Sequence, residues 1–323
     1  MTMPPFHRTF ILIAACLSVA AIAGCQRQQG NDHGTAAMNE TSAKPSAFAL
    51  EERAWRDKRR GDLLKPEGWL SLIGLHWLDP GAHYIGSNAG SGIRLAIGPE
   101  HLGMVDIAGQ QVRFTPDRAA TLTLDGQPLA DASVVLRTDA DPAGPSVIGF
   151  DEGKGHATVI VRNARYALRV RHADAPGRTQ FSGVDYWPAE PGWKVQGRFV
   201  PHPPGKTIEV ANIIGGMDAM SNPGVVEFEY DGKTHRIEAL DEGEGVLFLV
   251  FADRTNGHGS YGAGRFLDTP MPDANGNVVL DFNQSRNPPC AFTAFATCPL
   301  PPPENRLDLA ITAGEKAYQK PHS

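Results

Sequence analysis

Most of the chain after residue 66 alternates apolar and polar residues with a period of two, interrupted by turn dipeptides. The clearest case is 225–239, where Asp231-Gly232 separates two alternating runs, a pattern typical of a β-hairpin with a two-residue turn. Further strands are predicted over 157–162, 166–171, 193–199, 207–214 and 246–251. With 35 Gly and 26 Pro residues, the sequence leaves no long helix to form an α/β layer. The pattern therefore predicts an all-β protein of the sandwich or barrel type.

One helix is predicted ahead of the strands, over residues 47–65. Ser46 can cap its N-terminus, Glu52 and Arg56 are spaced for an ion pair, and Lys65-Pro66 ends it. An approximate subdomain boundary is predicted near Ala143-Gly144-Pro145, within the remainder of the chain. We expect two β subdomains, a small N-terminal one over 66–143 and a larger C-terminal domain over 144–318 that contains a proline-rich loop with two cysteines.

The first 24 residues have the features of a lipoprotein signal peptide. Arg8 precedes an apolar stretch over 10–22, and Ile22-Ala23-Gly24-Cys25 has the small residues of a lipobox. An N-terminal membrane anchor is the alternative, but the apolar stretch is too short for it. We expect cleavage before Cys25, acyl chains on its thiol, and a flexible linker over 25–46. Gln26, the residue after the acylated cysteine, then predicts that the protein is anchored at the periplasmic face of the outer membrane, if the organism is Gram-negative.

The charge of the chain bears on its partners. The formal net charge is −6 and basic residues form no block, which argues against binding to nucleic acid. The expected partners are the membrane, through the lipid on Cys25, and a small-molecule or protein ligand. No cofactor is predicted. In the crowded segment that contains Arg169 and Arg171, we expect the side chains to lie on the surface, although an inward-pointing arginine would form a polar floor.

The densest mixture of prolines, cysteines, aromatic and polar residues runs from Asp281 to Arg306, and we call this segment the C-terminal strap. Its prolines exclude a helix or a central strand, so it is expected to be rigid and extended. It either presents a preorganised polar surface to a ligand or only clamps a sheet. The ligand-binding candidates, including one arginine just before the strap, are Arg265, Asn283, Asn287, Thr293, Asn305 and Arg306.

Cys290 and Cys298 also belong to the strap. In an oxidising envelope they are expected to form a disulfide, because Cys16 leaves with the signal peptide and Cys25 is acylated. The alternative to a disulfide is that one of these cysteines is a catalytic thiol. Zinc is disfavoured by the spacing of the two cysteines and by the lack of a nearby His, so no metal site is predicted.

The strap carries a family resemblance. The run from Asn287 to Arg306, followed by Ala313-Gly314-Glu315-Lys316, resembles the signature of the uncharacterised bacterial and archaeal domain-of-unknown-function family number 1684. Gly68-Trp69-Leu70-Ser71-Leu72 and the segments 223–228 and 261–268 also match, so the resemblance extends from about Leu50 onward. It implies no established activity and assigns no catalytic residue.

Two classes of function remain open. The first is an envelope lipoprotein without catalytic activity that binds a small polar ligand or a partner through the strap. The second is an envelope hydrolase or lyase that draws a general acid and base from His258, Asp281 and Glu304. The first is preferred, because the sequence contains no nucleophile elbow, phosphate-binding loop or dinucleotide fingerprint.

Overall fold

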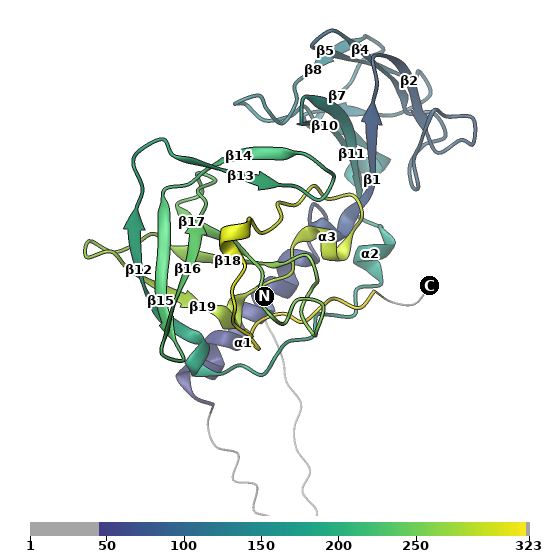
Figure 1. Cartoon of the computed structure of the whole chain (residues 1–323). Coiled ribbons are helices and arrows are strands. Elements are labelled where there is room, and N and C mark those ends of the chain that lie inside the picture. The colour runs from purple at the N-terminus through teal and green to yellow at the C-terminus, as the bar shows by residue number, and fades with distance from the viewer. Residues whose placement is uncertain (1–44, 321–323) are drawn as a thin grey trace, which may run out of the picture. The chain divides into compact units, whose positions relative to one another are not determined.

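The computed structural model describes residues 45–320 (Figure 1). The predicted signal peptide, the acylation site at Cys25 and all of the predicted linker except Pro45 and Ser46 lie outside these residues. Within the described part, no helix combines the length and the apolar composition needed to cross a membrane.

The predicted N-terminal helix is present as α1, Ala47–Leu63. The Ser46 side chain accepts a hydrogen bond from the Ala49 backbone N–H at 3.2 Å, which satisfies one free donor of the first turn. Glu52 does not form the expected ion pair. Its carboxylate is buried and accepts a hydrogen bond from Gln284 at 3.3 Å, so the helix is tied to the strap.

Two sheets enclose the first core. The six-stranded sheet has the order β1-β11-β10-β9-β6-β7, and the five-stranded sheet has the order β3-β2-β4-β5-β8. Their bounds are β1 Leu72–Leu78, β2 Gly81–Gly86, β3 Ile93–Arg94, β4 Gly103–Ala108, β5 Gln111–Pro116, β6 Thr123–Leu124, β7 Gln127–Pro128, β8 Val134–Leu136, β9 Ile148–Phe150, β10 Gly155–Arg162 and β11 Arg165–His172. Buried side chains such as Phe114 and Val159 come from both sheets and share one apolar cluster. The subdomain boundary predicted near Gly144 falls within the six-stranded sheet. Strands β6 and β7 of that sheet precede Gly144 in the chain, and strands β9 to β11 follow it.

The second core is formed by a four-stranded sheet with the order β16-β15-β12-β19 and the hairpin β17–β18, while the hairpin β13–β14 packs on a separate apolar cluster that contains Val210 and Phe248. Their bounds are β12 Lys194–Pro201, β13 Thr207–Ala211, β14 Met217–Ser221, β15 Gly224–Tyr230, β16 Lys233–Ala239, β17 Val246–Phe251, β18 Arg265–Pro270 and β19 Asn277–Asp281. The hairpin predicted over 225–239 is confirmed, because Tyr230 pairs with Lys233 across a turn in which Asp231 and Gly232 both have positive φ.

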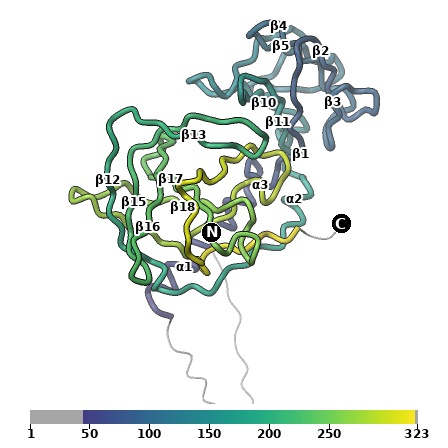
Figure 2. The backbone as a smooth tube through the Cα atoms, viewed as in Figure 1, coloured from purple at the N-terminus to yellow at the C-terminus, as the bar shows by residue number. Residues whose placement is uncertain are grey.

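The all-β class is confirmed, since almost all regular structure after α1 is antiparallel strand. The exceptions are the parallel pair β2–β3 and single helical turns, namely η1 Trp69–Ser71, η2 Asp151–Gly153, α2 Pro176–Thr179, η3 Pro191–Trp193, η4 Phe282–Gln284, α3 Pro289–Phe292 and η5 Pro303–Asn305. The expectation that prolines exclude a helix from the strap is wrong at α3, because Pro289 occupies the first turn, where no backbone N–H is needed. In Figure 2 the yellow C-terminal part of the chain, which contains most of the strap, lies beside the strands β17 and β18.

Candidate functional site

Two asparagines of the strap attach it to the backbone of other segments, Asn305 to strands β16 and β17 and Asn283 to the loop before η3. The Asn305 side chain accepts from the Glu238 N–H at 2.7 Å and donates to the carbonyl oxygens of Glu238 and Val250, both at 2.9 Å. The Asn283 side chain likewise accepts from the Glu190 N–H and donates to the Glu190 carbonyl oxygen, each at 3.0 Å. Both residues are fully buried, so these side chains serve the backbone and are closed to a ligand.

Arg265 is also committed to the interior. Its guanidinium forms an ion pair with Asp253 at 2.7 Å and donates to the carbonyl oxygens of Ile311, at 2.9 Å, and Ala313. Burial lowers the pKa of Arg265, and the Asp253 carboxylate opposes that shift. Because its exposed fraction is 0%, this arginine stabilises the domain interior and does not reach a ligand.

The remaining sequence candidates are spread over the domain. Thr293 is buried and accepts from the Phe295 N–H at 3.2 Å, while the Arg306 side chain is exposed. His258 is exposed, with its Nδ1 next to the Asn256 carbonyl oxygen, and Glu304 is exposed on η5. Asp281 is buried and lies 3.6 Å from the Lys194 amine. Within residues 45–320, no hydrogen bond or ion pair joins any two of His258, Asp281 and Glu304.

Cys290 and Cys298 lie side by side as free thiols. The Cys290 backbone N–H donates to the Cys298 sulfur at 3.1 Å, and the Tyr261 hydroxyl donates to the Cys290 carbonyl oxygen at 3.3 Å. The hydrogen bond between the thiols lowers the pKa of Cys290 and raises that of Cys298, and burial raises the pKa of Cys298 further. The expected disulfide stays a prediction.

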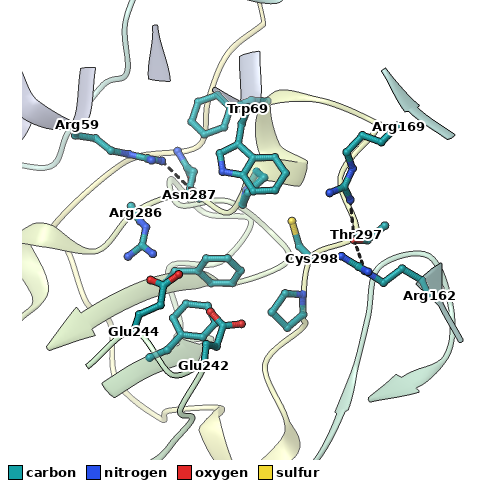
Figure 3. A pocket seen from close by; sticks show the side chains of 15 residues that line it. Arg59, Trp69, Arg162, Arg169, Glu242, Glu244, Arg286, Asn287, Thr297 and Cys298 are labelled. Carbon is teal, nitrogen blue, oxygen red and sulfur yellow. Dashed lines mark hydrogen bonds between the residues drawn. The ribbon is translucent and has the colours of Figure 1, made fainter. Parts of the chain in front are cut away.

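A cavity of about 290 Å³ opens beside the strap (Figure 3). Its walls come from α1, η1, strands β10, β11, β17 and β18, the loop between β16 and β17, and the strap. The lining residues are Arg59, Trp69, Arg162, Arg169, Glu242, Glu244, Phe248, Phe266, Arg286, Asn287, Pro289, Phe292, Thr297, Cys298 and Pro299. Of the sequence candidates, Asn287 and Cys298 belong to this set.

Three of the four arginines around the cavity are neutralised by a carboxylate. Arg59 pairs with Glu315 at 2.8 Å, Arg162 with Asp139 at 2.6 Å, and Arg286 with Asp268 at 2.8 Å. Each of these ion pairs fixes an arginine at the cavity wall without leaving its charge uncompensated.

Arg169 differs from the other three. Within the described residues its guanidinium has no carboxylate partner, and its one hydrogen bond goes to the Thr297 hydroxyl at 3.3 Å. Its exposed fraction is 9%, so the expectation of a surface position is wrong for this residue. Burial, together with the charges of Arg162 and Arg171, lowers the pKa of Arg169 to about 10. The group is still charged at neutral pH, and its Nε has no hydrogen-bond partner.

Asn287 connects the cavity to the buried network beneath the strap. Its backbone N–H donates to the Glu315 carboxylate at 2.7 Å, its side-chain amide donates to the Lys316 carbonyl oxygen at 2.7 Å, and its carbonyl oxygen accepts from Arg59 at 3.1 Å. The side-chain oxygen of Asn287 is buried without a partner. No group of three or more potential metal ligands gathers within residues 45–320.

The comparisons with known proteins bear on the C-terminal part of the chain. Residues 179–316 match the sequence model described as "Protein of unknown function (DUF1684)". These residues are a DUF1684 domain. Most of the cavity lining lies within the DUF1684 domain, but Arg59, Trp69, Arg162 and Arg169 come from the chain before it.

A solved structure is also similar in sequence. It is the solution NMR structure of an uncharacterized protein from Haloarcula marismortui, with 30% identity over 43% of this chain and 78% of that chain, and a TM-score of 0.36. No curated protein matches the chain.

Sequence reasoning missed Trp69, Glu242 and Glu244, and it placed Arg169 wrongly. No local motif marks these residues, because the cavity is assembled from segments far apart in the chain. One signal was present for Arg169, which stands between apolar residues in the run Ala167-Leu-Arg-Val170. A charged residue within such a run is a candidate for an inward-pointing position.

Proposed function

We propose that this protein is an envelope lipoprotein that binds a small anionic ligand in the arginine-lined cavity. The observation that carries the proposal is the buried guanidinium of Arg169, which faces a cavity without a carboxylate partner among the described residues. The lipid anchor and the envelope location rest on the N-terminal sequence that ends at Cys25.

An unpaired buried cation is costly. Removing a charge from water costs several kcal/mol, and nearby opposite charge is the usual compensation. Arg162 and Arg171 are like charges and add to the cost. Asp139, which is paired with Arg162, offsets part of it, and the one neutral hydroxyl in contact cannot balance the rest. A carboxylate or phosphate in the cavity would accept hydrogen bonds from Arg169 in the charge-assisted geometry that guanidinium groups favour.

The surroundings of Arg169 are rigid, which favours binding. Thr297, which contacts Arg169 and Arg162, belongs to the strap, and Asn305 and Asn283 fix that strap at fully buried positions. Side chains held in this way lose little conformational entropy when a ligand arrives, so more of the contact energy appears as affinity.

Thermal unfolding of the full-length protein in detergent tests the proposal, with acetate, benzoate and phosphate as probes against chloride at equal ionic strength. We expect at least one probe to raise the Tm in a saturable manner, because a ligand that binds only the folded state stabilises it. Arg169→Met should abolish the increase, and Arg94→Met, which removes an exposed arginine on β3, should keep it. If no anion stabilises the protein, or if Arg169→Met responds like the parent, the proposal is wrong.

The hydrolase or lyase alternative gains no specific support. Neither His258, Asp281 nor Glu304 lines the cavity, and two of the three side chains are exposed at separate places. A general acid and base must both reach one substrate, and these residues share no contact through which they would act together.

A further inference from the structure

The positive end of the cavity carries a single uncompensated charge. Arg162 and Arg169 both donate to the Thr297 hydroxyl oxygen at 3.3 Å. Arg162 is paired with Asp139, so within residues 45–320 Arg169 is the one arginine of the cavity lining without a carboxylate partner. Among the described residues its Nη1 has no hydrogen-bond partner and, unlike Nε, is not enclosed, so it keeps N–H groups for a ligand. A monoanion balances one such charge.

Apolar surface lies directly beside this charge. The guanidinium carbon of Arg169 lies 5.9 Å from the centroid of the Trp69 ring. Trp69 packs against a buried cluster that contains Phe248, Phe266 and Cys298, and all four residues line the cavity. An anion bound at Arg169 therefore meets apolar side chains with any atoms that extend beyond its charged group. Burial of apolar atoms there adds to the affinity, because they leave water.

A second negative charge on the ligand is disfavoured. Glu242 and Glu244 line the cavity, and neither forms an ion pair within the part of the chain described. Figure 3 shows both carboxylates on a different side of the cavity from Arg162 and Arg169. Burial raises the pKa of Glu242, and the charges of Glu244 and Asp268 raise it as well, so a further carboxylate near this wall would be repelled. A ligand with one negative charge, held at Arg169, avoids this repulsion.

The cavity is also small. Its volume is about 290 Å³, and a water molecule in the liquid takes up about 30 Å³, so the cavity holds roughly ten non-hydrogen atoms. We propose that the ligand is a short apolar monocarboxylate, with its carboxylate at Arg169 and Thr297 and its hydrocarbon body against Trp69, Phe248 and Phe266. This inference rests on the proposed function, since it keeps the anion site and names the class of anion.

Four probes separate the inference from the anion site alone. Acetate, butyrate and hexanoate differ only in the length of the hydrocarbon body, and adipate has the chain length of hexanoate with a second carboxylate at its far end. Calorimetric titration of the full-length protein in detergent should show the affinity rising about threefold for each added methylene group, because each leaves water for an apolar wall. Adipate should bind at least about tenfold more weakly than hexanoate, because its second charge would have to leave water as well. Titration into detergent without protein gives the uptake by micelles, which is subtracted.

A variant of the apolar wall completes the test. Trp69→Gln should reduce the ratio of hexanoate to acetate affinity about fivefold or more, because it removes the ring beside the guanidinium of Arg169. Trp77→Gln is the matched control. Trp77 is also partly buried next to an arginine, with the Arg165 guanidinium carbon 4.3 Å from its ring centroid, but it does not line the cavity.

The probe series on the parent protein decides the inference whether or not Trp69→Gln folds. Equal affinities for acetate and hexanoate, or for adipate and hexanoate, would overturn the apolar monocarboxylate and leave the anion site standing. If none of the carboxylates binds, the inference and the proposed function are both wrong.

Discussion

Replacement of Arg169 by methionine should stabilise the protein in the absence of ligand, although most changes at buried positions destabilise. The pKa of Arg169 falls by more than two pH units to about 10, chiefly through burial. At about 1.4 kcal/mol per pKa unit, the charged side chain costs the folded state about 3 kcal/mol. Methionine keeps much of the side-chain volume and removes this cost.

Two favourable contacts are lost in the same substitution. The hydrogen bond to Thr297 contributes about 1 kcal/mol, and the guanidinium lies 5.9 Å from the Trp69 ring centroid, a cation–π contact that contributes about 0.5–1 kcal/mol. The net expectation is a stabilisation of about 1–2 kcal/mol. Because the pKa in the folded state lies below that in the unfolded state, the penalty is fully present at any pH below about 10.

Arg162→Met is the matched contrast, since Arg162 lines the same cavity but is paired with Asp139 at 2.6 Å. The side chains of that pair are 29% and 23% exposed, so the loss of the pair should destabilise by only about 1 kcal/mol. The two variants remove the same charge and are expected to shift stability in opposite directions.

Urea unfolding of the full-length protein in detergent, with ligand-free samples and a comparison of m-values, measures both effects. Arg169→Met should raise the free energy of unfolding and at the same time lose the stabilisation by anions. If it instead lowers the free energy of unfolding by more than about 1 kcal/mol at an unchanged m-value, the charge of Arg169 is compensated inside the protein. The physical argument for a bound anion would then fail.

Three further outcomes are expected. Asn305→Ala should lower the free energy of unfolding by about 2–3 kcal/mol in urea titrations, because it leaves buried backbone groups of two strands without partners. A loss below about 0.5 kcal/mol would show that Asn305 does not hold the strap to these strands. Burial acts to raise the pKa of Glu238, but hydrogen bonds from His202 and Asn222 lower it overall below 4.5, so the stability it contributes is present above that pH and lost as the pH falls. Glu238→Gln should therefore flatten the acid limb of the stability curve, and an unchanged limb would contradict the assignment. Thiol titration of unreduced envelope protein should find neither Cys290 nor Cys298 reactive, and free thiols in such material would exclude the disulfide.

Local chemistry made much of the fold predictable. Alternation and the Asp231-Gly232 turn were sufficient for the β15–β16 hairpin, because the turn conformation and the strand periodicity depend on neighbouring residues alone. Ser46 and Lys65-Pro66 similarly indicated where α1 begins and ends. The choice of ligand-binding residues in the strap was less successful, since Asn283 and Asn305 bind backbone groups.

The sequence by itself determined the all-β class, the N-terminal helix and the main hairpin, since each depends on residues close together in the chain. Only the tertiary structure decided which arginine is buried at the cavity without a carboxylate partner. Arg169 and Arg171 are two positions apart on β11, and sequence alone does not distinguish them. The packing of η1, the strap and the β16–β17 loop around a cavity buries Arg169 without a carboxylate. The cost of a buried charge depends on its surroundings in space, and those surroundings come from segments far apart in the sequence.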